Sequence, residues 1–229
     1  MKFRASSLIA IATFVTLAVG MGSGSARGGQ AEVRGKAALM DPAAAKDQAP
    51  ATFKVNFDTT KGTFVVEVQR DLAPFGADRF YNLVKRGFYD DSGFYRVLPT
   101  VAEFGVPGDP DIWKTWRSAR IPDDQRKISN TRGTVALLQV AGKDRRTTRV
   151  FINKLDNSSF MDKQAPFAPA PFGRVLSGMN VVDQIYGGYG EGAPTGKGPD
   201  TNRFDAEGNA YLKKEFTELD FIKTATIVP

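Results

Sequence analysis

The chain has 229 residues, of which 41% are hydrophobic and 11% aromatic, which is enough for one well-buried core but not for two full domains. It contains no cysteine and no histidine, which excludes disulfides, thiol nucleophiles, histidine acid–base relays and the common zinc and iron ligand sets. The net charge is +6, but Lys2, Arg4 and Arg27 belong to an N-terminal stretch without acidic residues, so the remainder carries only +3. A charge this small and dispersed argues against nucleic-acid binding.

Residues 1–26 have the layout of a secretory signal peptide. Met1–Arg4 is basic, an apolar run of about 13 residues begins at Leu8, and small residues continue to Ala26. The run is shorter than the roughly 20 residues of a membrane span, which favours cleavage, near Gly20 or after Ala26, over a retained anchor. We therefore expect an exported protein, periplasmic or secreted, with no stable membrane insertion after cleavage.

Residues 27–51 are predicted to be a flexible linker and residues 52–229 the folded domain. The linker has little hydrophobic periodicity and contains several alanine, glycine and proline residues. The domain begins with two alternating segments, Phe53–Asp58 and Gly62–Gln69, and the turn residues between them predict a β-hairpin.

A helix is expected to follow the hairpin, because Pro74 suits a first helical turn and Gly87 a C-cap. The later segments predict strands at Gly133–Val140, Arg149–Asn153, Phe172–Leu176 and Phe221–Val228, a short helix at Asn180–Tyr186 and an irregular Gly/Pro-rich stretch at Gly190–Gly208. Many short strands with two helices predict an all-β sheet that closes into a barrel, since closure removes exposed sheet edges.

One arginine, Arg96, lies within the aromatic and aliphatic alternation Phe94–Leu98. In a regular strand the period of two places Phe94, Arg96 and Leu98 on one face. A guanidinium among large apolar side chains, with no carboxylate in its own strand, is either paired from elsewhere or directed at a ligand.

The long polar segment Gly105–Arg132 carries Trp113 and Trp116. A loop of this length in a compact domain is usually functional or a lid. The two tryptophans are expected to hold the loop on the sheet rather than to bind a ligand.

The order of these segments resembles the cyclophilin-type peptidyl-prolyl cis-trans isomerases. The matching stretches are Lys61–Val68, Ala73–Pro74, Phe80–Val84, Gly87–Asp90, Phe94–Pro99, Gly108–Pro110, Gly133–Ala136, Val150–Asn153, Pro171–Val175 and Gly178–Ile185. The resemblance runs from about Phe53 to Val228 and implies a closed eight-stranded antiparallel barrel capped by two α-helices. It also implies isomerisation of Xaa–Pro bonds in unfolded or exported proteins by a monomer that needs no cofactor and no metal.

The resemblance assigns roles to individual positions. Arg96 falls on the catalytic arginine of the family, and Phe151 falls on the aromatic floor of the proline pocket. Met161 would be a wall of that pocket, with Phe160 as its outer aromatic.

Other groove positions depart from the family pattern. The Phe-Met-x-Gln motif reads Val101–Phe104 here, so Ala102 replaces its methionine and Phe104 its glutamine. Arg149 replaces the glutamine of Gln-Phe-Phe, and Gln139 ends the stretch that replaces Met-Ala-Asn. All four residues are expected at the substrate groove, where the changes weaken peptide anchoring and favour reduced activity.

Two other functions remain open from the sequence. A cyclophilin-like module that binds peptide without efficient turnover is expected if Glu103 neutralises Arg96, whereas an isomerase is expected if Arg96 stays free. A hydrolase using Ser158 or Ser159 with Lys163 is the weakest alternative, because these residues lie on a predicted surface loop. The basic run Lys143 to Arg146 is either a solvated turn or a flank of the groove that favours acidic residues near the proline.

Overall fold

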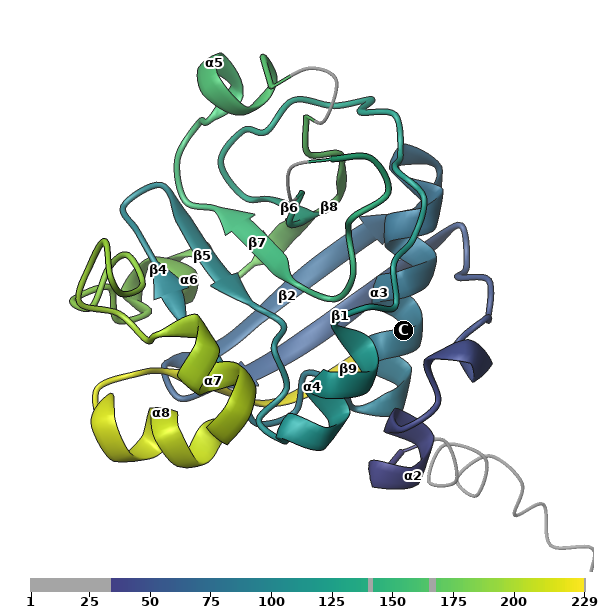
Figure 1. Cartoon of the computed structure of the whole chain (residues 1–229). Coiled ribbons are helices and arrows are strands. Elements are labelled where there is room, and N and C mark those ends of the chain that lie inside the picture. The colour runs from purple at the N-terminus through teal and green to yellow at the C-terminus, as the bar shows by residue number, and fades with distance from the viewer. Residues whose placement is uncertain (1–33, 140–141, 165–167, 229) are drawn as a thin grey trace, which may run out of the picture.

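The computed structural model describes residues 34–139, 142–164 and 168–228, and the predicted signal peptide in residues 1–26 lies outside them. Nine strands form one antiparallel sheet in the order β3-β9-β1-β2-β8-β6-β7-β5-β4. They are β1 (Thr52–Thr59), β2 (Gly62–Gln69), β3 (Ser92–Gly93), β4 (Arg96–Val97), β5 (Val101–Phe104), β6 (Thr134–Leu137), β7 (Val150–Asn153), β8 (Pro171–Ser177) and β9 (Phe221–Val228). Figure 1 shows the long strands β1 and β2 with the helix α3 (Pro74–Arg86) beside them.

The described residues also form several short helices. These are α2 (Lys36–Leu39), η1 (Pro42–Ala44), η2 (Arg70–Leu72), α4 (Pro110–Trp116), α5 (Ser158–Met161), α6 (Met179–Gln184), α7 (Thr201–Glu207) and α8 (Asn209–Glu215). The predicted pair of helices is therefore an underestimate, because α4, α5, α7 and α8 lie in segments that have no long hydrophobic period.

The predicted hairpin and the predicted helix are both confirmed. β1 and β2 pair from Thr52 opposite Gln69 to Thr59 opposite Gly62. α3 runs from Pro74 to Arg86, and Gly87 caps it with a left-handed φ of 75°. The Gly87 amide donates to the Val84 carbonyl, and the next amide, that of Phe88, donates to the Leu83 carbonyl. The apolar stripe of α3 is fully buried against the sheet, so this helix covers the main core.

The sheet is an open, curled half-barrel, and the prediction of a closed eight-stranded barrel is wrong. β3 and β4 are two-residue strands at opposite edges of the sheet, although they belong to one chain segment, Ser92–Val97. The Phe94 amide still donates to the Asp220 carbonyl beside β9, whereas Arg96 already pairs with β5. The chain changes its strand partner between these residues, so the ladder of hydrogen bonds is interrupted there.

This interruption also changes which side chains share a face. Phe94 lies in the main core, Tyr95 lies in a second cluster beneath α7 and α8, and Arg96 points to the outer face. The predicted common face of Phe94 and Arg96 is therefore wrong, because the period of two holds only within an unbroken strand.

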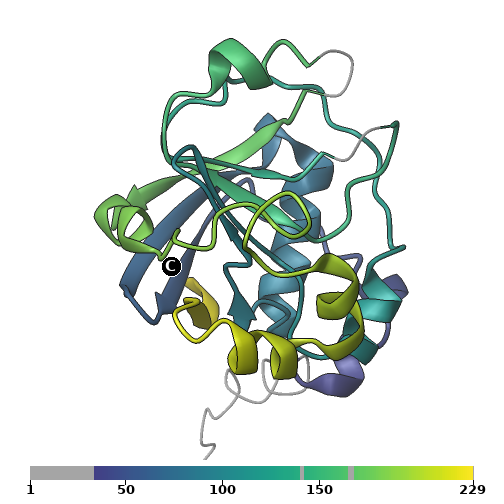
Figure 2. The ribbon, with the colours of Figure 1, turned by 60° about the vertical axis from the view of Figure 1, so that its left-hand side comes forward.

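The second apolar cluster joins α7 and α8 to the rest of the domain. It contains Tyr95, Trp113 and Phe204, which are almost fully buried, together with residues of α8 and the segment that precedes β9. Figure 2 shows the two helices side by side below the strands. Trp116 is buried in the main core and donates to the Leu39 carbonyl, so the long segment is anchored by both tryptophans.

The described part of the predicted linker lies against the domain. Leu39 and Ala49 are buried in the main core, and the Asn82 side chain of α3 both accepts from the Asp47 amide and donates to its carbonyl. Arg34 donates to the Ala225 carbonyl on β9 at 2.7 Å. From residue 34 onward this segment is therefore packed, despite its low hydrophobic periodicity.

Among the residues that the structure describes, no helix has both the length and the apolar character that crossing a membrane requires.

Candidate active site

A row of four directly paired residues crosses the outer face of the sheet. Arg96 on β4 is opposite Glu103 on β5, Glu103 is opposite Phe151 on β7, and Phe151 is opposite Ala136 on β6. Side chains of directly paired residues point to the same face of a sheet. The strand register therefore places a cation, a carboxylate and an aromatic ring next to one another.

Arg96 is held by two carboxylates. Its Nη1 donates to Glu103, and its Nε and Nη2 donate to the two Glu191 oxygens at 2.7 Å each. Hydrogen bonding to Glu191, followed by the charge of both glutamates, raises the pKa of Arg96 above its ordinary value. Of its five N–H groups, these bonds occupy three, and two remain without a partner among the described residues.

The two carboxylates differ in environment. Glu103 is buried, and burial raises its pKa above the ordinary value although the Arg96 charge opposes this. Glu191 is 42% exposed on the loop between α6 and α7, and its hydrogen bonds from Arg96 lower its pKa. Glu191 is a site residue that sequence reasoning missed, because nothing in the chain marks contact across 95 residues.

The residues next to Glu103 on β5 face the opposite way. Ala102 and Phe104 are fully buried in the main core, where the Phe104 ring packs on Phe57 and Tyr89. Neither side chain reaches the outer face, so the prediction that Ala102 and Phe104 lie at the substrate groove is wrong. Glu103, not Phe104, occupies the position beside Arg96.

An apolar cluster surrounds Phe151 on the same face. Phe151, Val101 and Ala136 are buried there, and the half-buried side chains of Met161, Leu98 and Leu138 pack against them. Met161 and Phe151 are thus brought together as the sequence predicts, with Met161 at the end of α5. Phe160, the predicted outer aromatic, is 68% exposed on the same helix.

A buried amide network fixes the position of α5. Asn157, which precedes the helix, donates from its side chain to Asn153 at 2.6 Å and to the Thr100 carbonyl at 3.0 Å. Asn130 donates to Asp162, which follows the helix, from its amide and from its side chain. These bonds hold both ends of the short helix that carries Met161.

Arg149 and Gln139 flank the cores of β7 and β6 in the sequence, and the structure gives each a different set of contacts. The Arg149 guanidinium stands over the rings of Trp113 and Tyr95, at 5.3 and 5.9 Å from their centroids. Its positive charge also acts to lower the pKa of Glu103, against the effect of burial. Gln139 is half-buried and donates to the Gly142 carbonyl at 3.2 Å. Both positions remain predicted substrate contacts.

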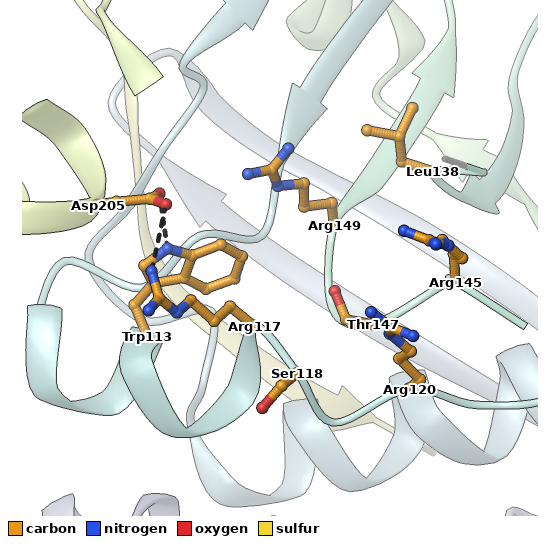
Figure 3. Close-up of a pocket in the computed structure, with 9 residues that line it drawn as sticks. All are labelled: Trp113, Arg117, Ser118, Arg120, Leu138, Arg145, Thr147, Arg149 and Asp205. Carbon is orange, nitrogen blue, oxygen red and sulfur yellow. Dashed lines mark hydrogen bonds and ion pairs between the residues drawn. The ribbon is translucent and has the colours of Figure 1, made fainter. Parts of the chain in front are cut away.

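A groove of about 360 Å³ adjoins the site through Arg149. Its lining includes Trp113, Leu138 and four arginines, Arg117, Arg120, Arg145 and Arg149. Figure 3 shows these side chains around an open centre, with Arg149 and Arg117 near Trp113 and with Arg120 and Arg145 beyond Thr147.

A curled antiparallel sheet that carries an arginine and a buried aromatic cluster on one face is the arrangement that the resemblance implies for a peptide-bond isomerase. The family described as cyclophilin type peptidyl-prolyl cis-trans isomerase/CLD matches residues 53–207. The chain therefore belongs to the cyclophilin-type peptidyl-prolyl cis-trans isomerase family.

Individual relatives agree with this assignment. A peptidyl-prolyl cis-trans isomerase of Acinetobacter baylyi is 32% identical over 136 residues, which cover 59% of this chain and 72% of the relative. Peptidyl-prolyl cis-trans isomerase B of Escherichia coli is 29% identical over 137 residues, which cover 58% and 84% of the two chains. The crystal structure of a Cryptosporidium parvum cyclophilin type peptidyl-prolyl cis-trans isomerase shares the fold, with a TM-score of 0.57 at 15% identity over 78% of this chain and 98% of that one.

Proposed function

We propose that this chain isomerises Xaa–Pro bonds in exported proteins, with Arg96 as the catalytic donor and Phe151 and Met161 as the proline pocket. The observation that carries the proposal is the row from Arg96 to Phe151, in which a charged donor and a buried aromatic ring lie on one face of the sheet with Glu103 between them. The N-terminal basic and apolar segment supports export, because a folding catalyst then meets chains that have just crossed a membrane.

The reaction is a rotation about a single Xaa–Pro bond, and it is slow without a catalyst. Amide resonance imposes a rotation barrier of about 20 kcal/mol, so Xaa–Pro bonds exchange over tens to hundreds of seconds. In the twisted transition state the prolyl nitrogen has a free lone pair, which a cationic N–H donor stabilises more than it stabilises the planar ground state. Arg96 retains its charge at all relevant pH values, and two of its N–H groups have no partner among the described residues and are available for this role. The pocket around Phe151 holds the ring while the bond turns.

The two carboxylates reduce the strength of this donor. Arg96, Glu103 and Glu191 together carry a net charge of −1 when ionised, so the field at the prolyl nitrogen is weaker than that of an unpaired arginine. This observation favours a second function, a cyclophilin-like module that binds proline-containing peptide and turns it over slowly. The half-exposed position of Glu191 supports the isomerase, because a bound peptide is able to displace a carboxylate that lies in a surface loop.

The first experiment measures isomerisation of a short Xaa–Pro peptide by the mature protein and by Arg96→Ala. We expect the wild type to accelerate exchange and the variant to lose about 100-fold in kcat/KM, since one transition-state donor is worth about this much. Circular dichroism confirms that the variant is folded. If both folded proteins leave the exchange rate unchanged but bind the peptide, the binding module is the correct function.

Export is tested separately on the full chain. Expression in a bacterium followed by cell fractionation is expected to place a shortened protein in the periplasm or the medium. An intact chain that stays in the cytoplasm would contradict this part of the proposal.

A further inference from the structure

The arginine-lined groove next to the active site has a large excess of positive charge. Among the described residues, Asp205 is the one carboxylate that lines it, and this side chain accepts from Trp113 Nε1 at 2.6 Å and lies 3.9 Å from Arg117. Arg120, Arg145 and Arg149 form no ion pair with any carboxylate in the described part of the chain. Three guanidinium groups of this groove therefore form no ion pair with a described carboxylate, and the one carboxylate in its lining, Asp205, lies beside Arg117.

The walls of this groove are fixed by a buried ion pair. Ile121 and Arg146 form an isolated antiparallel bridge, so the loops that carry Arg120 and Arg145 lie next to each other. The Arg146 side chain is 2% exposed, and its Nη1 lies 3.0 Å from Asp124. The expectation of a solvated turn is thus wrong for Arg146, which serves as an internal anchor.

Asp123 and Asp144 complete the connection between the two loops. The amide of each residue donates to the carboxylate of the other, at 2.8 and 2.9 Å. Because Arg146 points inward, its neighbour Arg145 is left on the groove side (Figure 3). The two loops that carry Arg120 and Arg145 are therefore hydrogen-bonded to each other, which lowers the entropy cost of binding an anion between them.

The groove also has an apolar part, and it lies next to the row of paired residues that contains Arg96 and Phe151. The side chains of Trp113 and Leu138 line it, and Leu138 also packs against the pocket around Phe151. Arg149 lines the groove and contributes to the electrostatics of Glu103, the residue next to Arg96. A peptide whose proline lies on Phe151 therefore passes this groove within a few residues.

We propose that the groove binds an acidic side chain of the peptide substrate, so that the protein prefers prolines flanked by aspartate or glutamate. The inference rests on the proposed function, since it requires that the proline lies on Phe151. A carboxylate fits three arginines through charge-assisted hydrogen bonds, while its short aliphatic stem contacts Trp113 or Leu138.

The test uses pairs of proline peptides that differ only by Glu or Gln at each position on either side of the proline. Binding is measured by calorimetry and isomerisation by NMR exchange, both at low and at high salt. We expect the Glu peptide to be favoured about fivefold at one position or more, and salt to reduce this ratio because part of the site is exposed. In Arg120→Gln/Arg145→Gln the ratio is expected to fall toward one.

Lys223→Gln is the matched control, because it removes one exposed cation from β9, in the other half of the sheet. It is expected to keep the wild-type ratio. Equal binding of Glu and Gln peptides at every position would overturn the inference, even if isomerisation is fast. Absent isomerisation with a clear Glu preference in binding would instead contradict the proposed function and support the groove.

Discussion

At the scale of single residues, the central fact is that Arg96 is shared between two carboxylates of different kinds. Glu103 comes from the neighbouring strand and is buried, whereas Glu191 comes from a distant loop and is half-exposed. The sequence identifies Arg96 as the catalytic candidate and Glu103 as a possible partner. It does not identify Glu191, because only the fold brings that loop to β4.

Glu191→Gln is expected to raise kcat/KM about two- to fivefold, since it removes a half-exposed negative charge that competes with the substrate for the partly buried Arg96, and ion pairs near the surface are worth about 0.2–1 kcal/mol. Peptide isomerisation at low salt measures the effect. Glu207→Gln on α7 is the control, because it breaks a similarly exposed pair with Arg203 away from the site. A fall in kcat/KM would mean that Glu191 positions Arg96 instead of competing with substrate.

The pH dependence of activity should report on Glu103. Burial raises its pKa, so this carboxyl takes up a proton at a higher pH than an ordinary glutamate, whose pKa is 4.5. Protonation removes one negative charge beside Arg96, and kcat/KM is therefore expected to rise as the pH falls from neutral toward that titration. Glu103→Gln should flatten this part of the profile. A wild-type profile that declines over the same range would refute the role assigned to Glu103.

The same raised pKa has a consequence for stability. The folded state binds this proton more tightly than the unfolded state, so the contribution of Glu103 is most favourable at low pH and is lost as the pH rises through its folded pKa. Both kcat/KM and the stability contributed by Glu103 are therefore expected to increase as the pH falls. Unfolding measured across the same pH range distinguishes a change in activity from a change in the folded fraction.

At the scale of elements, the short helix α5 shows how a pocket wall is held without a long hydrophobic period. It has four residues and no side-chain cap, and its position depends on the buried amides of Asn130 and Asn157 at its two ends. The sequence does not show which polar loop residues form hydrogen bonds with one another. The bonds that hold α5 could therefore not be predicted.

Asn130→Ala is expected to lower the free energy of unfolding by about 1–3 kcal/mol, because it leaves buried partners such as the Pro169 carbonyl unsatisfied. KM for a proline peptide should rise more than kcat falls, since Met161 loses its fixed position. Urea unfolding and peptide kinetics measure the two effects. Asn180→Ala, which removes an exposed amide on α6, is the control and should change neither. If both variants behave alike, the network does not hold the pocket.

At the scale of the whole molecule, the domain is larger than the part that matches its family. The family match ends at residue 207, and α8, β9 and the packed segment 34–51 lie outside it. β9 joins β1 to β3, and residues 34–51 cover α3, so these segments complete the sheet and the main core. We expect them to be required for full stability.

Leu39→Ala tests this at the N-terminal side. Leu39 is 8% exposed in the main core, so its truncation is expected to cost about 2–5 kcal/mol of unfolding free energy, near the lower end because the site lies at the edge of the core. Its neighbour Met40 is 40% exposed, and Met40→Ala is expected to be nearly neutral. Thermal unfolding compares the two variants. Equal melting temperatures would show that the segment behaves as the flexible linker predicted from the sequence.

The sequence by itself determined the β1–β2 hairpin, the limits of α3, most of the later strands and the identity of Arg96, Phe151 and Met161 as candidates. Those features depend on local rules: the period of two, the proline and glycine at helix ends, and the order of short motifs. Only the tertiary structure decided where the chain changes its strand partner between Phe94 and Arg96 and that Ala102 and Phe104 point into the core. It also decided that Glu191 accepts hydrogen bonds from the Arg96 guanidinium. These depend on strand register and on contacts between distant segments, which no local pattern encodes.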